Sequence, residues 1–150
     1  MIRRAGDPRG GFTLLEITIV VSVIALLTAF AIPSYLRSRI NTAETSAMAS
    51  CRTINVGCQS FYGANPARAY PATLNDLTAT ASPYLDAVLG SGTKQGYQFV
   101  YTQLDPQHFE TRASPVTPGV TGTRFFYLDQ TGVLRVNAVG PAGPADPPVE

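Results

Sequence analysis

The chain of 150 residues has little of the chemistry that catalytic sites use. It contains one histidine, two cysteines and no tryptophan, and only 14% of its residues are charged. Since His108 is the only histidine, a metal centre or catalytic pair with two histidines cannot form within one chain. Gly90-Ser91-Gly92 lacks the Lys-Ser/Thr pair that follows a phosphate-binding loop. The residues therefore predict a protein that is not an enzyme and holds no metal ion or cofactor.

Charge of either sign is also scarce. The formal net charge is +1, and this near-neutral balance gives no support for electrostatic binding to nucleic acid. Charge is entirely missing between Ile17 and Leu36, where twenty consecutive residues include no Asp, Glu, Lys or Arg. A helix of that length is roughly 30 Å long, which matches the hydrocarbon core of a bilayer. The run predicts a single membrane-spanning helix.

Arginines flank this run. Arg3, Arg4 and Arg9 precede it, whereas Arg37 and Arg39 follow it. Basic residues ahead of a first apolar helix keep that end in the cytoplasm, so the residues after Arg39 are expected outside.

Glu16 lies at the start of the apolar segment and has no cationic neighbour in the sequence. A carboxylate at membrane depth costs on the order of 2.5–3.5 kcal/mol, so such residues usually have a partner and a function. Cleavage between Gly11 and Phe12 would create an α-amino group four residues before Glu16, with a pKa near ~8. Between staggered helices, the amine of one copy would meet the carboxylate of another. The pattern predicts self-assembly of processed subunits.

The segment Gly11-Phe12-Thr13-Leu14-Leu15-Glu16, with the apolar run and Pro33 behind it, resembles the processing signature of type IV pilins and of the related pseudopilins. The resemblance is close over about the first fifty residues and holds in outline for the rest. It implies that a prepilin peptidase cleaves after Gly11 and methylates the amine of Phe12. It also implies that Glu16 neutralises this amine in a neighbouring subunit, and that the helix kinks or loosens at Pro33. The C-terminal cysteine pair of many type IV pilins is missing.

With this resemblance, the chain divides into four parts. A leader peptide covers residues 1–11, and an apolar helix for the membrane or the filament core covers 12–36. A globular domain follows over 37–139, and a flexible tail rich in proline and glycine over 140–150. Two other interpretations stay open. In one, Ala29-Phe30-Ala31 is the cleavage site of an ordinary secretory signal; in the other, the chain is an uncut membrane anchor.

The helix is expected to continue beyond the membrane to about Tyr62, because Gly57 is the only Pro or Gly between Tyr35 and Tyr62. An apolar stripe at steps of three or four predicts packing against a sheet; its members are Ala47, Cys51, Ile54, Cys58, Phe61 and Tyr62. Other faces are expected to carry mainly Arg37, Glu44, Arg52 and Gln59.

Cys51 and Cys58 leave two alternatives. Seven residues apart on one helix, their Cα atoms would be roughly 10 Å apart, beyond the ~7 Å limit for a disulfide. They are then buried small apolar residues. A disulfide would require the helix to end between them, at a residue such as Gly57.

After Gly96, apolar and polar residues begin to alternate with a period of two. It predicts strands over 97–102, 108–113, 123–128 and 133–136, with turns at Asp105-Pro106 and at 129–132. A short helix is expected after Thr73. The fold class is therefore α+β, with a long N-terminal helix packed in its second half against a three- or four-stranded antiparallel meander, as in the pilin fold that the resemblance implies.

The resulting functional hypothesis is a structural subunit of a type IV pilus-like filament, of the kind that serves cell adhesion or motility. Its expected partners are further copies of itself, the prepilin peptidase and methyltransferase, and the assembly machinery. It would lie in the inner membrane before assembly and in an extracellular filament afterwards. The first alternative is a type II secretion pseudopilin, which would be periplasmic. The second, from another class, is a monomeric membrane-anchored binding module.

Overall fold

The computed structural model describes residues 11–149. The longest element is the helix α1, Leu14–Ala64, whose 51 residues match the expected length of about fifty. The chain divides after Leu36 into two compact units, and α1 contributes to both. The expected leader falls mostly on residues 1–10 and so lies outside the described part. In the second unit, α1 is followed by the short helices α2, Leu74–Thr78, and α3, Ala87–Gly90.

A five-stranded antiparallel sheet completes the second unit, with the strands in sequence order. Its members are β1 (Thr93–Lys94), β2 (Tyr97–Asp105), β3 (His108–Pro115), β4 (Phe125–Asp129) and β5 (Arg135–Asn137). The expected α+β fold with an antiparallel meander is confirmed, with one strand more than the three or four predicted. Prediction missed β1, which is two residues long.

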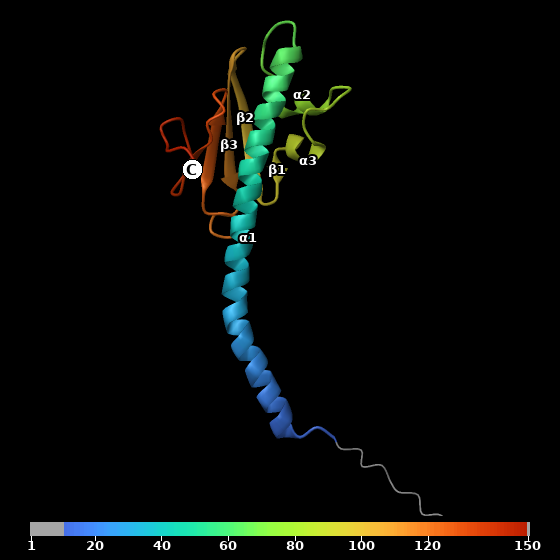
Figure 1. Cartoon of the computed structure of the whole chain (residues 1–150), viewed down its shortest axis with the longest axis vertical. Coiled ribbons are helices and arrows are strands. Elements are labelled where there is room, and N and C mark those ends of the chain that lie inside the picture. Colours follow the sequence, from blue (N-terminus) through green and yellow to red (C-terminus); the bar gives the residue numbers. More distant parts are fainter. Residues whose placement is uncertain (1–10, 150) are drawn as a thin grey trace, which may run out of the picture. The chain divides into compact units, whose positions relative to one another are not determined.

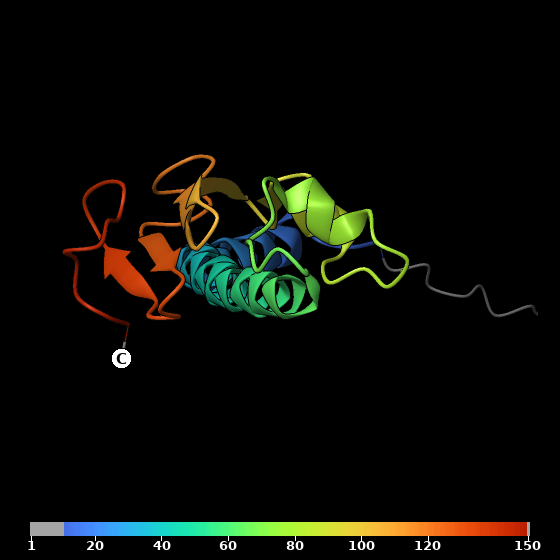
Figure 2. The same cartoon turned by 90° about the horizontal axis from the view of Figure 1, so that it is seen from above.

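Residues 37–64 of α1 lie along the sheet, and α2 and the C-terminal segment lie on opposite sides of this part of the helix (Figures 1 and 2). The core of the second unit includes buried side chains from α1, the sheet and the connecting segment, among them Ala47, Cys51, Ile54, Cys58, Leu77, Leu89, Tyr97, Phe99, Phe109, Phe126 and Leu128. The apolar stripe predicted on the helix is confirmed, since its last two members, Phe61 and Tyr62, pack against this core.

Glu44 does not lie on the face of α1 where it was expected. It was expected mainly away from the packing stripe, but it is buried, with 2% of its surface exposed. The reason is its spacing: Glu44 precedes Ala47 by three residues and Cys51 by seven, so all three share one helix face.

The Glu44 carboxylate joins α1 to the segment between β3 and β4. Its Oε1 accepts hydrogen bonds from the Thr123 backbone N–H and hydroxyl, both at 2.8 Å, and from the Arg124 backbone N–H at 3.2 Å. Its Oε2 accepts from Arg124 Nε at 2.6 Å. Burial raises the pKa of Glu44, but the hydrogen bonds from Thr123 and Arg124 outweigh it and hold the pKa below its ordinary value.

The C-terminal segment also differs from expectation. Residues 140–150 were predicted to be a flexible tail, but residues up to 149 are bonded to β5. Val136 N donates to Pro147 O at 3.0 Å, and Val149 N donates to Leu134 O at 2.8 Å. Gly143 N and the Asn137 side-chain amide both donate to the Asp146 carboxylate. Prolines fix the backbone at low entropic cost, so this segment can be ordered with few apolar contacts.

Glu44 should make the stability of the second unit depend on acid. Because its pKa is lowered by folding, its contribution is complete above its ordinary value of 4.5 and is lost as the pH falls from there through the folded pKa. We expect Glu44→Gln to lower the free energy of unfolding by about 2–3 kcal/mol at pH 7, less than for a fully buried pair because Arg124 is partly solvated. The difference in the free energy of unfolding between Glu44→Gln and the unmodified chain should become smaller below about pH 4.

Unfolding of the detergent-solubilised chain, followed by circular dichroism in urea at several pH values, measures this effect. Glu110→Gln is the matched control, because Glu110 pairs at 3.0 Å with the exposed Arg112 on the sheet surface. It should change stability by less than about 1 kcal/mol. Equal effects of the two substitutions would contradict the role given to Glu44.

Candidate assembly site in the apolar half of α1

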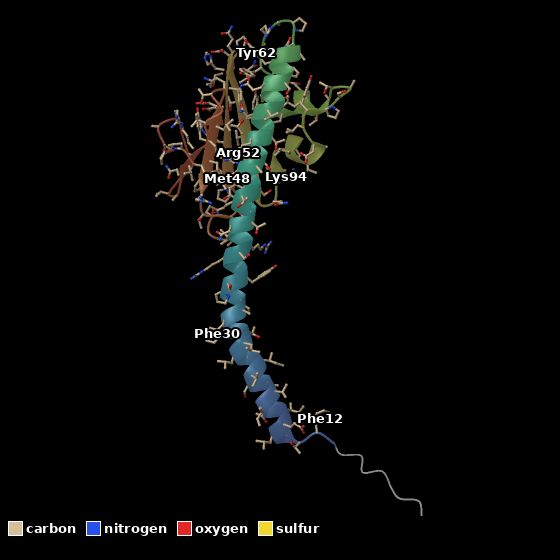
Figure 3. The ribbon with its side chains drawn as sticks, viewed as in Figure 1. Phe12, Phe30, Met48, Arg52, Tyr62 and Lys94 are labelled. Atoms are coloured by element: carbon tan, nitrogen blue, oxygen red, sulfur yellow. The ribbon has the colours of Figure 1, made fainter. Side chains whose placement is uncertain are left out.

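Every residue from Gly11 to Arg39 is exposed in the structure. Phe12 and Leu14 are 80% and 87% exposed, and Phe30 is 74% exposed (Figure 3). Moving each large apolar side chain from water into an apolar environment would lower the free energy by about 1.5–3 kcal/mol. Within the described residues nothing covers this surface, so it requires lipid or another polypeptide.

Among the residues that the structure describes, α1 is the one helix long and apolar enough to cross a membrane, by length and composition alone. The core helix of a soluble protein can have the same composition, but none of this apolar window is buried. By length and composition the helix could span a membrane, and a signal sequence near the N-terminus would have the same properties.

The first turn of α1 is closed by a reciprocal pair of hydrogen bonds between Thr13 and Glu16. Glu16 N donates to Thr13 Oγ1 at 3.2 Å, and Thr13 N donates to Glu16 Oε2 at 3.5 Å. This is a capping box, in which the residue before the helix and the third helical residue satisfy each other's backbone N–H groups. Sequence reasoning missed it, although Thr13-Leu14-Leu15-Glu16 has the required Ser/Thr-x-x-Glu spacing.

The capping box leaves part of the Glu16 carboxylate available. Within the described residues Oε1 accepts no hydrogen bond, and Glu16 is exposed. Phe12 precedes the box, so cleavage after Gly11 would leave both hydrogen bonds intact. Gly11 is in open space, where a Cβ would meet no atom within 4 Å. The fold of this chain therefore does not demand glycine at this position.

Three hydroxyls of the apolar run are satisfied by the helix itself. The hydroxyls of Thr18, Ser22 and Thr28 each donate to the carbonyl four residues earlier. Pro33 lies inside α1, and the helix continues through it although proline has no N–H to donate to Ala29. The kink expected at Pro33 stays a prediction. Glu16, just ahead of this run, keeps an exposed carboxylate oxygen that could accept a hydrogen bond from another chain.

The other candidate residues take structural places in the second unit. Cys51 and Cys58 are free and buried, and α1 continues unbroken through Gly57, so the disulfide alternative is not formed. Burial raises the pKa of both thiols to about 12, which keeps them protonated and unreactive at neutral pH.

Asp129, a carboxylate that could bind a cation, takes part in the turn after β4. Its Oδ1 accepts from Thr131 N at 2.9 Å and closes this turn. The described residues include no group of three or more His, Cys, Asp or Glu side chains placed to hold a metal ion.

No family model matches the chain, and no curated protein or solved structure is significantly similar to it. Its function is therefore argued from its own residues.

The capping box gives a testable local effect. Thr13→Val removes the hydroxyl that accepts from Glu16 N and should cost the first turn about 1 kcal/mol. Hydrogen exchange of the Glu16 amide, measured by NMR in detergent micelles, should then become about fivefold faster. Thr13→Ser keeps the hydroxyl and should exchange as the unmodified chain does. If valine and serine behave alike, the hydrogen bond contributes nothing.

Proposed function

We propose that this chain is a subunit of a type IV pilus-like filament. It is inserted in the inner membrane through the apolar half of α1, cleaved between Gly11 and Phe12, and methylated at Phe12. It then polymerises, with the apolar helices of many copies in the filament core and the sheet domains outside. The peptidase and the assembly machinery are its partners before it joins the filament.

One observation carries this proposal: the exposed apolar half of α1 has a single carboxylate, Glu16, which lies in the first turn of the helix and four residues after Phe12. A plain membrane anchor is selected to avoid such a charge, because it costs free energy in lipid. In a filament subunit, by contrast, the Glu16 carboxylate would stabilise the assembly by neutralising an α-amine in the apolar core. In a medium of low dielectric constant an unpaired amine is disfavoured, so the pairing would also fix the stagger between neighbouring helices.

The capping box supports this role by fixing where the carboxylate lies. A glutamate has several rotamers, and holding it in one of them costs conformational entropy. The hydrogen bond from Thr13 N restricts Glu16 Oε2 before a second subunit arrives, while Oε1 has room for a further donor. A type II secretion pseudopilin would use the same first fifty residues for a periplasmic filament, so it shares this mechanism.

The first test is the intact mass of the mature protein with N-terminal fragmentation. Prepilin processing predicts a chain that begins at N-methylated Phe12. A chain that begins at Ile32 would identify an ordinary secreted protein and end the filament proposal. A chain that still begins at Met1 would leave the membrane anchor.

The second test separates the charge of Glu16 from its capping role. Glu16→Ala removes both, whereas Glu16→Gln keeps the oxygen that caps the helix and removes the charge. If charge neutralisation drives assembly, both variants should reduce sheared filaments at least tenfold while the chain still fractionates with membranes. Thr28→Ala, which removes a locally bonded hydroxyl, is the control. Normal filaments from Glu16→Gln would contradict the charge mechanism, and unchanged behaviour of Glu16→Ala would favour the monomeric anchor.

A further inference from the structure

Two exposed valines lie on the segment between β3 and β4. Val116 is 57% exposed and Val120 is 60% exposed. The segment is not a loose loop: Gly119 N donates to Gly122 O at 2.8 Å, and Thr117 N donates to the Thr121 hydroxyl at 3.1 Å. The backbone therefore holds both apolar side chains at the surface instead of letting them fold inward.

This segment is fixed to the rest of the second unit at both ends. Val116 N donates to Gly96 O at 2.9 Å, and the Tyr97 hydroxyl donates to Arg124 O at 2.9 Å. Gly122 packs so closely on Tyr97 that a Cβ at this position would lie 2.0 Å from the Tyr97 hydroxyl oxygen. Together with the Glu44 network, these contacts place the segment beside the first turns of α1 in this unit.

An open pocket of about 340 Å³ lies where the segment meets α1. It is lined by Arg39 and Ala43 of the helix, by Gln95 and Gly96 of the turn between β1 and β2, and by Val120 and Thr121. The lining includes one cation and no carboxylate. Arg39 is exposed and forms no ion pair with the described residues. The pocket thus combines an unneutralised guanidinium with an exposed apolar side chain.

The position of Arg39 in the chain indicates what this pocket meets. Arg39 is three residues beyond Leu36, so it lies only about 4.5 Å along the helix from the end of the apolar run. The headgroup layer of a bilayer extends roughly 5–8 Å beyond the hydrocarbon core on each side. Whatever the direction of the apolar half, a chain that spans the membrane places Arg39 within reach of lipid phosphates.

We propose that Arg39 and the valine segment, residues 116–121, form a contact surface for anionic phospholipid headgroups. The guanidinium binds the phosphate through its planar set of donors, and Val116 and Val120 insert among the glycerol and upper acyl groups. This inference rests on the membrane insertion proposed above. It gives the sheet domain a second attachment to the membrane before assembly, one that a subunit must release to enter a filament.

Charge complementarity favours lipid over a second copy as the occupant. After loss of residues 1–11 the chain has eight basic and nine acidic residues, a formal charge of −1, so one copy offers another no strong negative field. A leaflet that contains anionic lipid presents many phosphates at the depth of Arg39, and attraction to it is worth most within a Debye length of the surface.

The test uses the full chain in lipid nanodiscs that carry a nitroxide-labelled headgroup, with methyl NMR as the readout. One set of discs contains phosphatidylcholine only, and the other contains one quarter phosphatidylglycerol. In the anionic discs we expect the paramagnetic relaxation of the Val116 and Val120 methyl groups to exceed that of Val139 at least threefold. Val139 is 94% exposed on another loop and serves as the internal reference.

Arg39→Gln should reduce this enhancement at least twofold in the anionic discs. Arg52→Gln is the matched control, because Arg52 is also exposed on α1 but lies thirteen residues, or about 20 Å, further along the helix (Figure 3). Unchanged methyl shifts in the core would show that both variants are folded. An equal effect of the two substitutions would overturn the role of Arg39.

Three further results would contradict the proposal. Equal relaxation enhancement of the valine methyl groups in neutral and anionic discs would show that the surface does not recognise anionic headgroups. Enhancement no greater than that of Val139 would show that the segment does not reach the bilayer. Broadening of Val116 and Val120 that appears only when a disc holds more than one copy would identify a second subunit as the occupant. Failure of the chain to enter discs would instead contradict the membrane insertion on which both proposals rest.

Discussion

The buried carboxylate of Glu44 is the interaction on which the arrangement of the second unit depends. Antiparallel strands define a sheet, but they do not determine where the sheet lies along a long helix. Apolar contacts between Ile54 and its neighbours tolerate small shifts, whereas a buried charge tolerates none, because each lost hydrogen bond leaves it unpaired. By accepting from Thr123 and Arg124, Glu44 fixes one point of α1 against the segment that leads into β4. The positions of Tyr97, Gly122 and the valine segment follow from that point.

The helix α1 has two halves, and the sequence changes character between them. In its apolar half, the hydroxyls of Ser22 and Thr28 bond to the helix's own carbonyls, whereas Glu16 keeps one exposed carboxylate oxygen without a hydrogen bond from the described residues. Its second half carries one buried stripe and exposed polar faces. The two carboxylates on α1 therefore differ in kind: Glu44 has all its partners within the domain, whereas Glu16 keeps one oxygen unoccupied and is suited to a partner supplied by assembly.

Much of this structure was predictable from the sequence because long periodic patterns are hard to misread. The uncharged run, the stripe through Cys51 and Ile54, and the helix after Thr73 all follow from spacing and local chemistry. What was missed depends on partners distant in the chain. Glu44 was expected on another face because Arg124 follows it by eighty positions. The strand β1 was missed for a different reason: it is two residues long and pairs with the start of β2 directly after it, which is too short for an alternating pattern. The Thr13–Glu16 capping box was a local signal that was overlooked. For the candidate site, the sequence predicts roles for Gly11, Phe12 and Glu16, which stay predictions, whereas the Arg39 pocket needed three segments brought together by folding.

The bonding of residues 147–149 to β5 limits how the sheet can grow. An outermost strand normally presents backbone donors and acceptors to which a strand of another molecule can add. Here β5 is only three residues long, and the chain beside it contains Pro147 and Pro148, which have no N–H to offer outward. Pro147 therefore uses its carbonyl inward, toward Val136, and ends the ladder. Lateral addition of strands is blocked at this edge, so copies that associate on the β5 side must do so through side chains. On this side, association therefore leaves the backbone hydrogen bonds of the domain unexchanged.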